Sequence, residues 1–322
     1  MMNEAIKQFA SQFAFEPEIM GGHVGEYRRV IIAGMGGSHL AADVVKMFIP
    51  EIEFVIHSDY GLPALSNEEF ASCLFIASSY SGNTEETLDA FAAAKARGLP
   101  RAALSVGGAL IAQAEKELVP YIRLPSTGIQ PRSALGFMAI ALLKLLRKET
   151  ELSRLAGLVE SLDPRAYSDA GAALASRMRG RVPVIYSSRA NSAIALNWKI
   201  KLNETGKIPA FWNVFPELNH NEMTGFDAVG ETKPLSANFY FVLLQDDNDH
   251  PRVQKRMQFT DRLLRDRGFT VETVALEEGD VFRKVFASLL TADWTAYYTA
   301  TGYGSEPNEV PMVEEFKKLM KT

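Results

Sequence analysis

The sequence predicts an α/β protein of two tandem domains, each built on a doubly wound parallel sheet. The chain has 322 residues, more than one hydrophobic core usually organises, so two domains are expected. Short apolar runs alternate with helical stretches along most of the chain. This alternation is typical of parallel strands joined by helices that cover both faces of a sheet.

The first half of the chain contains the clearest strands. Each is a short apolar run that ends at a turn, and the helices between them are rich in Ala, Leu, Glu and Lys. The helix after the third strand ends at Gly98, a residue type common at helix C-termini. An amphipathic helix is expected over residues 3–20. The candidate strands are residues 29–33, 53–57, 73–77, 101–106 and 121–124.

The first strand is followed by a glycine-rich turn, Gly34-Met35-Gly36-Gly37-Ser38. Glycines remove side chains where a ligand or another backbone must come close, and they allow positive φ. The spacing differs from a dinucleotide fingerprint, because His39 stands where the third glycine would be. Taken alone, the turn is as compatible with a structural role as with ligand binding.

A second turn, rich in hydroxyl groups, lies between strand 73–77 and the next helix. Free backbone N–H groups and the helix dipole favour an anion at such a helix start. The alternative is an ordinary capped helix with Asn83 or Thr84 as N-cap. Both turns follow strands of one parallel sheet, so they should lie at the edge where such sheets bind ligands. The hydroxyl residues are Ser78, Ser79, Ser81 and Thr84.

A third candidate is Arg132, which follows Pro131 at the start of a helix that extends to about Lys148. A guanidinium group there can make two parallel hydrogen bonds to a phosphate or another oxyanion. A solvated surface arginine is the alternative interpretation.

The second half looks like a degenerate copy of the first, with a strand, a hydroxylated turn and a helix. We place the domain boundary between residues 155 and 156, which divides the chain into domains 1–155 and 156–322. The expected strands are residues 182–188, 239–244 and 270–276, and the expected helices are residues 191–203, 251–267 and 281–300.

The most unusual segment is residues 202–222, which contains aromatic residues and prolines without a helical or alternating period. We expect it to lie in a domain or subunit interface, because exposed aromatic surface is costly. Within it, Glu204 and His220 are a candidate acid/base pair. A carboxylate and an imidazole can each carry a proton in general acid–base catalysis.

Bulk properties exclude several classes of function. A net charge of −5 without a Lys/Arg-rich block argues against nucleic-acid binding. No apolar run approaches the ~18–20 residues of a membrane span, and the N-terminus lacks the pattern of a signal peptide. The single cysteine, Cys73, suits a reducing cytoplasm. No His/Cys cluster has the spacing of zinc ligands.

Together, the motifs resemble a known family. The segments 34–38, 79–84 and 131–136 resemble the sugar isomerase (SIS) domain. The patterns Glu204-x-x-Lys207-x-Pro209-Ala210-Phe211 and 215–222 resemble the signature of the bifunctional phosphoglucose/phosphomannose isomerases. The resemblance implies two SIS domains of flavodoxin-like topology in tandem.

The resemblance also implies a role for each site residue. Glu204 would carry the proton between C1 and C2, and Arg132 would stabilise the enediolate and hold Glu204 in place. His220 would open the ring from the neighbouring subunit of a homodimer. A lysine of the C-terminal helix would assist ring opening. We map this lysine to Lys317, and Lys318 is adjacent. The residues implied to hold the phosphate are Gly36, Gly37, Ser38, Ser79, Ser81 and Thr84.

The implied activity is a metal-independent isomerisation without a cofactor. Glucose 6-phosphate and mannose 6-phosphate would interconvert with fructose 6-phosphate through a cis-enediol. One alternative is a non-catalytic SIS protein that senses sugar phosphates, which gives no role to Glu204 and His220. Another is a SIS isomerase for a different sugar phosphate.

Overall fold

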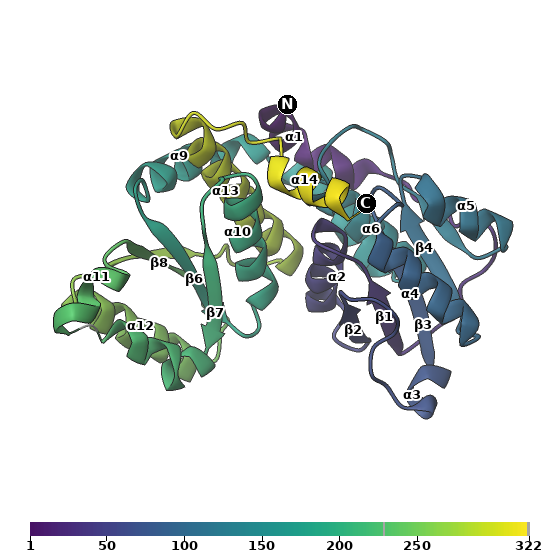
Figure 1. Cartoon of the computed structure of the whole chain (residues 1–322), viewed down its shortest axis with the longest axis horizontal. Helices are drawn as coiled ribbons and strands as arrows, with labels where there is room; N and C mark the ends of the chain where they lie inside the picture. The colour runs from purple at the N-terminus through teal and green to yellow at the C-terminus, as the bar shows by residue number, and fades with distance from the viewer. Residues whose placement is uncertain (228, 321–322) are drawn as a thin grey trace. The chain divides into compact units, whose positions relative to one another are not determined.

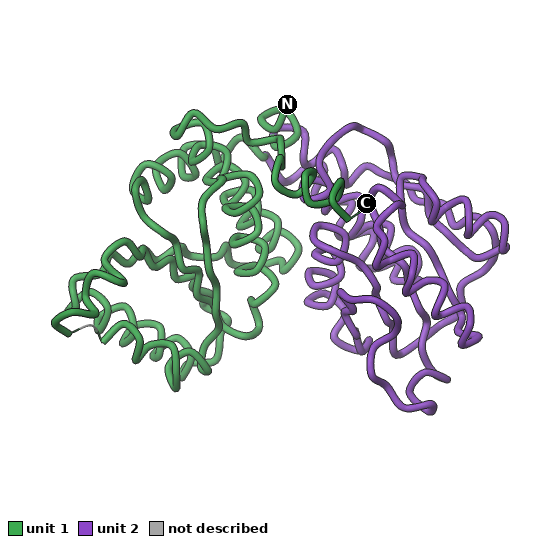
Figure 2. Tube along the Cα trace, in the orientation of Figure 1, with its two compact units in different colours: residues 1–6, 164–322 green, residues 7–163 purple. Residues whose placement is uncertain are grey.

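The computed structural model describes residues 1–227 and 229–320 (Figure 1). The chain divides into two compact units (Figure 2). The N-terminal unit is Lys7–Asp163, and the C-terminal unit is Pro164–Thr322 together with Met1–Ile6. The division therefore follows the short helices α7 (Glu149–Ala156) and α8 (Leu158–Ser161), whereas we placed the boundary between residues 155 and 156.

The N-terminal unit contains a five-stranded parallel sheet in the order β2-β1-β3-β4-β5. This is the flavodoxin-like order of a doubly wound sheet. Each predicted strand of this half is present, and no end differs by more than one residue from its predicted position. The strands are β1 (Arg29–Ala33), β2 (Glu53–His57), β3 (Cys73–Ser78), β4 (Arg101–Ser105) and β5 (Tyr121–Arg123).

Helices cover both faces of this sheet. On one face, α2 (Gly37–Phe48) packs against α6 (Leu135–Leu145), whose side chains are buried almost all round. On the other face, α4 (Glu85–Ala96) and α5 (Gly108–Lys116) contribute Phe91 and Leu110 to a core with Phe75. The smaller α3 (Asn67–Ala71) lies between β2 and β3 in the chain. The helix predicted over residues 3–20 is instead two short pieces, α1 (Met2–Lys7) and the 3-10 helix η1 (Phe9–Ala14).

The C-terminal unit repeats the pattern with a four-stranded parallel sheet in the order β7-β6-β8-β9. In this order β6 and β8 hold the places that β1 and β3 hold in the first sheet. The long helix α13 packs against α9 and α10, and α12 contributes Met257 and Leu264 to the core of the opposite face. No helix among the described residues is long and apolar enough to cross a membrane. The elements are α9 (Ser168–Arg177), β6 (Val182–Ser188), α10 (Ser192–Glu204), β7 (Phe211–Phe215), β8 (Phe239–Gln245), α11 (Lys233–Ser236), α12 (Pro251–Asp266), β9 (Thr270–Ala275), α13 (Val281–Gly302) and α14 (Pro311–Leu319).

Strand β7 was missed by the sequence interpretation, which left residues 202–222 without regular structure. β7 is the edge strand of its sheet, and only its last two residues, Val214 and Phe215, are buried. Asn213 interrupts the apolar residues of β7, so this strand shows neither the alternation nor the continuous apolar run that identifies a strand. Phe211, at the start of this strand, is 53% exposed in the single chain.

The contact between α9 and α13 predicts a steric effect on stability. A Cβ at Gly171 would lie 2.4 Å from Cβ of Trp294 and 2.8 Å from the backbone nitrogen of Thr295. We expect Gly171→Ala to lower the free energy of unfolding by about 1–3 kcal/mol through overpacking. This loss exceeds the gain of up to about 1 kcal/mol from the better helix propensity of alanine. Gly225→Ala is the control, since nothing lies within 4 Å of its Cβ position. Equal melting temperatures for the two variants would contradict the prediction.

Candidate active site

The turn between β1 and α2 touches the turn between β3 and α4. A Cβ at Gly34 would lie 2.6 Å from the carbonyl oxygen of Ser78, so a larger residue would separate the turns. The Ser78 hydroxyl donates to the carbonyl of Ser38 at 2.7 Å, and the N–H of Tyr80 donates to the Ser38 hydroxyl at 2.9 Å. Gly36, at the N-terminus of α2, has a φ of 51°, which favours glycine. The structure thus brings the two predicted turns together at one edge of the sheet.

Within the hydroxyl-rich turn, the side chains differ in exposure. Ser79 is buried; its hydroxyl accepts from the N–H of Gly82 at 3.1 Å and shares a hydrogen bond of 2.9 Å with the Thr84 hydroxyl. Ser81 is exposed and Thr84 is half-buried. Thr84 is the N-cap residue of α4, but its side chain makes no capping bond to the helix. The turn therefore presents hydroxyl groups and a helix N-terminus without a side-chain cap, which suits an anion.

A third turn, between β4 and α5, packs against this one and was missed by the sequence interpretation. A Cβ at Gly82 would lie 1.8 Å from the carbonyl oxygen of Gly107, and one at Gly108 would lie 2.5 Å from that of Ser81. The N–H of Ala109 donates to Oδ1 of Asn83 at 3.0 Å. The available signal was the pair Gly107-Gly108 directly after a strand, the same pattern as Gly36-Gly37.

Arg132 lies beside the first turn, in the short 3-10 helix η2 (Pro131–Ser133). A Cβ at Gly37 would lie 2.8 Å from the backbone nitrogen of Arg132. Arg132 is only 3% exposed, so the solvated-arginine alternative is wrong. Gln12, which the sequence interpretation did not single out, holds this segment: its amide donates to the carbonyl of Ser133 at 2.7 Å and accepts from the N–H of Gly136 at 3.0 Å.

Glu204 and His220 lie at opposite ends of the strands of the second sheet. Glu204 ends α10, which returns from the C-terminal end of β6 to the edge where the parallel β7 begins. His220 lies in η4 (Glu217–His220), just after the other end of β7. A 13-residue helix is about 20 Å long and a five-residue strand about 16 Å. One chain therefore does not bring these two side chains together.

The segment that carries His220 is held from both sides. Nδ2 of Asn219 donates to the Thr260 hydroxyl at 2.9 Å, and Nδ2 of Asn221 donates to Glu217 at 2.8 Å. The carboxylate of Glu222 accepts from the hydroxyl of Tyr186 at 2.6 Å and from Nδ2 of Asn213. Burial, together with the Glu222 charge, raises the pKa of Tyr186. The His220 side chain is exposed and makes no hydrogen bond or ion pair with any of the described residues.

Lys317 lies on α14, a helix without a buried residue. Its ammonium group pairs with Glu314 at 2.7 Å, and both side chains are more than half exposed, at 60% and 54%. The apolar residues of this helix are exposed too, among them Met312, Val313 and Phe316. Lys318 is also exposed, so the geometry does not favour one lysine over the other.

Comparison with known proteins identifies the family. Residues 168–320 match the family model of the bacterial phospho-glucose isomerase C-terminal SIS domain. The bifunctional phosphoglucose/phosphomannose isomerase of Caldicellulosiruptor bescii is 34% identical over 309 residues, which cover 91% of this chain and 89% of that protein. The chain belongs to the bifunctional phosphoglucose/phosphomannose isomerase family. The family member from Aquifex aeolicus is 30% identical, and the match covers 99% of this chain and 98% of that one.

Solved structures support the same fold for this phosphoglucose/phosphomannose isomerase family member. The crystal structure of glucosamine-6-phosphate deaminase from Thermotoga maritima superposes with a TM-score of 0.70. The superposition covers 96% of both chains at 15% sequence identity. At this identity the likeness concerns the fold alone, and it agrees with the predicted tandem α/β architecture.

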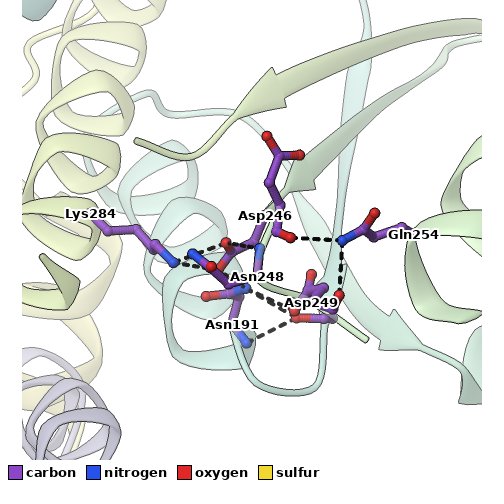
Figure 3. A network of polar contacts seen from close by, with 8 residues as sticks. Asn191, Asp246, Asn248, Asp249, Gln254 and Lys284 are labelled. Atoms are coloured by element: carbon purple, nitrogen blue, oxygen red, sulfur yellow. Dashed lines mark hydrogen bonds and ion pairs between the residues drawn. The ribbon is translucent and has the colours of Figure 1, made fainter. Parts of the chain in front are cut away.

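In this family member, a network of charged and amide side chains lies at the carboxyl ends of strands of the second sheet (Figure 3). At the ends of β6 and β8, Lys284 of α13 binds both carboxylate oxygens of Asp246, at 2.9 and 2.8 Å. Nδ2 of Asn191 donates to Asp246 at 3.0 Å and to the Ser188 hydroxyl at 3.1 Å. All of these side chains are buried. A buried ion pair therefore occupies this edge of the second sheet, whereas the first sheet has hydroxyl groups and helix N-termini there.

The two aspartates of this network have opposite pKa shifts. Burial would raise the pKa of Asp246, but hydrogen bonds from Lys284, Asn248 and Asn191 hold it below its ordinary value. Burial raises the pKa of Asp249, and the neighbouring Asp246 charge adds to that shift. Oδ2 of Asp249 is buried without a hydrogen-bond partner among the described residues. Across those same residues, no group of three or more His, Cys, Asp or Glu is placed to hold a metal ion.

These shifts predict opposite effects of two similar substitutions. A raised pKa in the folded chain means that the ionised Asp249 costs stability at pH 7, so Asp249→Asn should raise the melting temperature there. Asp246→Asn should lower it at pH 7, because its pKa is depressed and Lys284 loses its carboxylate.

Melting temperatures measured between pH 7 and pH 3 test both halves of this prediction. The difference between each variant and the native chain should shrink on acidification. For Asp249, it shrinks as the carboxyl group becomes protonated in both the folded and the unfolded chain; for Asp246, it shrinks as the pH falls through the depressed pKa. A decrease at pH 7 that is the same for both variants would contradict the prediction.

Proposed function

We propose that this chain is an aldose–ketose isomerase that interconverts glucose 6-phosphate and mannose 6-phosphate with fructose 6-phosphate. The observation that carries the proposal is the match to phosphoglucose/phosphomannose isomerases over nearly the whole chain. The turns at the edge of the first sheet and the carboxylate of Glu204 supply the chemistry that such a reaction needs. The proposal includes a metal-independent reaction and a cytoplasmic location, which the single buried thiol of Cys73 suits.

The phosphate is assigned to the first domain of our prediction, residues 1–155. Backbone N–H groups at the starts of α2 and α4 and the hydroxyls of the second turn can bind its oxygens. Because the turns are joined by hydrogen bonds to one another, these donors are already in place before the ligand arrives. The phosphate-binding residues are Gly36, Gly37, Ser38, Ser79, Ser81 and Thr84.

The second domain, residues 156–322, supplies the acid/base chemistry. The Glu204 carboxylate removes the proton from C2 of the open-chain aldose, and the C2–H electron pair becomes the C1–C2 double bond of the enediolate. Glu204 then delivers this proton to C1. A second proton passes from the C2 oxygen to the C1 oxygen, and the product is the ketose. Reprotonation at C2 on either face of the planar intermediate yields glucose or mannose 6-phosphate, so one site serves both epimers.

Arg132 stabilises the negative charge on the enediolate oxygens and orients Glu204. His220 and Lys317 open the ring: one group removes the proton of the C1 hydroxyl while the other protonates the ring oxygen as the C1–O5 bond breaks. His220 comes from the partner subunit of a homodimer. Its exposed place on a firmly held segment, at the sheet edge opposite Glu204 of its own chain, supports this assignment.

Glu204→Gln tests the catalytic proposal. The amide cannot take up the C2 proton, so kcat should fall by about 10²- to 10⁴-fold while KM changes little. Coupled assays with glucose 6-phosphate, mannose 6-phosphate and fructose 6-phosphate measure both constants. Glu278→Gln, at an exposed glutamate of the same unit, is the control and should retain native turnover.

Three results would contradict the proposal in different ways. Near-native turnover of Glu204→Gln would remove this residue from the mechanism. A native chain that binds these sugar phosphates without converting any of them would be a sensor. Turnover confined to an amino-sugar or pentose phosphate would indicate a different SIS isomerase.

Mixed dimers test whether His220 acts across the interface. If it does, a dimer of one Glu204→Gln chain and one His220→Ala chain contains one intact site, formed by the native Glu204 and the native His220. Random exchange of equal amounts should therefore restore about a quarter of native activity in a two-fold symmetric dimer. If His220 acts within its own chain, no mixture gains activity. A monomeric mass at the assay concentration with full activity would also contradict the proposal.

A further inference from the structure

One buried side chain, Gln12, binds the backbone of the segment that carries Arg132. Gln12 belongs to η1 and is 3% exposed. Its Nε2 donates to the carbonyl of Ser133 at 2.7 Å. Its Oε1 accepts from the N–H of Gly136 at 3.0 Å and from the N–H of Phe137 at 3.3 Å. The amide is therefore bound through both its donor and its acceptor to backbone more than a hundred residues away in the sequence.

The two N–H groups are the ones that an N-cap side chain usually binds. The first N–H groups of a helix have no partner within the helix, and an N-cap oxygen accepts from the second or third of them. The N-cap residue of α6 is Ala134, which has no side-chain oxygen, and Gly136 and Phe137 are the second and third residues of this helix. A Cβ at Gly136 would lie 2.8 Å from Cβ of Gln12, so this approach requires glycine. Gln12 thus caps α6 from another part of the chain.

The same segment contacts the start of α2. A Cβ at Gly37 would lie 2.8 Å from the backbone nitrogen of Arg132 and 3.1 Å from its Cα. The next residue, Ser133, is the one whose carbonyl binds Gln12. The backbone that carries Arg132 is therefore packed against one of the turns assigned to the phosphate and bound by one amide. A shift of this backbone would move Arg132 relative to that turn.

Glutamine suits this position because its amide has both a donor and an acceptor. A glutamate carboxylate could accept from the two N–H groups at the helix N-terminus, but when ionised it has no hydrogen to donate to Ser133. A methionine is similar in length and makes neither kind of hydrogen bond. Since the site is buried, backbone groups that lose this partner would be left unpaired.

We propose that Gln12 is a positioning residue for the isomerisation: it holds the backbone of residues 133–137 and so fixes Arg132 beside the first phosphate turn. The inference rests on the proposed role of Arg132 in stabilising the enediolate. A donor stabilises developing charge only at hydrogen-bond distance, and a displacement of ~1 Å can cost up to about 100-fold in rate. Because other groups hold the phosphate, such a displacement should lower kcat more than it changes substrate binding.

The first test is Gln12→Met, which removes all three hydrogen bonds. We expect kcat to fall by about 10- to 100-fold with little change in KM. Both constants are measured with glucose 6-phosphate and fructose 6-phosphate at a temperature at which the variant is fully folded. Gln12→Glu, which can keep the bonds to the two N–H groups, replaces Gln12→Met if that variant does not fold, and should lower kcat by a smaller factor.

A double-mutant cycle with Arg132→Met separates positioning from a general loss of stability. If Gln12 acts through Arg132, then Gln12→Met should change kcat by less than about twofold once Arg132→Met is already present. A purely structural role would lower the melting temperature in both backgrounds and leave the kcat of the folded chain unchanged in both.

Ser66 provides the matched control, because it is an N-cap at the opposite end of the strands of the same sheet. Its hydroxyl accepts from the N–H of Glu69 at 3.2 Å, at the start of α3, and α3 ends just before β3 begins. Ser66→Ala should lower the melting temperature and retain native kcat and KM.

The proposal is overturned if Gln12→Met retains native kcat, if it lowers kcat as much in the Arg132→Met background as in the native chain, or if Ser66→Ala lowers kcat equally. Native turnover of Arg132→Met would also overturn it, by removing Arg132 from the mechanism. Failure of the proposed function looks different: the native chain would convert none of the sugar phosphates, or Glu204→Gln would retain near-native turnover.

Discussion

Parallel strand pairing is the constraint on which the rest of this structure depends. In each sheet all strands point the same way, so every strand ends at one edge and every returning helix ends at the other. The pairing gathers the turns after β1, β3 and β4 at one edge of the first sheet. In the second sheet it separates Glu204, at the end of a returning helix, from His220, just after a strand. Placement of the functional groups thus follows from strand direction before any side chain is considered.

The turns of the first sheet combine ligand chemistry with close packing. Ser38 and Ser79 could bind a phosphate, yet their hydroxyls also accept backbone N–H groups of the neighbouring or their own turn. The glycines permit this contact, since a Cβ at Gly82 would collide with Gly107. Donors fixed by such contacts lose little conformational entropy when an anion binds. In the second sheet, the buried pair Lys284–Asp246 occupies the corresponding edge, and the buried pair Lys201–Asp293 joins the helix that carries Glu204 to α13.

Sequence patterns were most informative where a local signal agreed with the fold. The central strands β1 and β3 of the first sheet are apolar runs because they are buried on both faces, and both were predictable. The edge strand β7 was not, because Asn213 interrupts its apolar residues. The role of Gln12 could not be predicted either, because its side chain binds the backbone of Ser133 and Gly136, more than a hundred residues away in the sequence. The raised pKa of Asp249 likewise could not be predicted, because it depends on burial and on the nearby charge of Asp246, which only the tertiary structure shows.

The residue types and their spacing were enough to indicate a tandem α/β protein, the glycine and hydroxyl turns, and Glu204 and His220 as candidates for acid/base chemistry. These features are local, because turns, helix ends and apolar runs are each specified by residues that are neighbours in the sequence. Only the tertiary structure decided that Arg132 is buried beside Gly37 and that Lys201 binds Asp293. It also decided that Glu204 and His220 lie at opposite sheet edges. Those facts come from strand order and from contacts between distant segments, which local spacing does not specify.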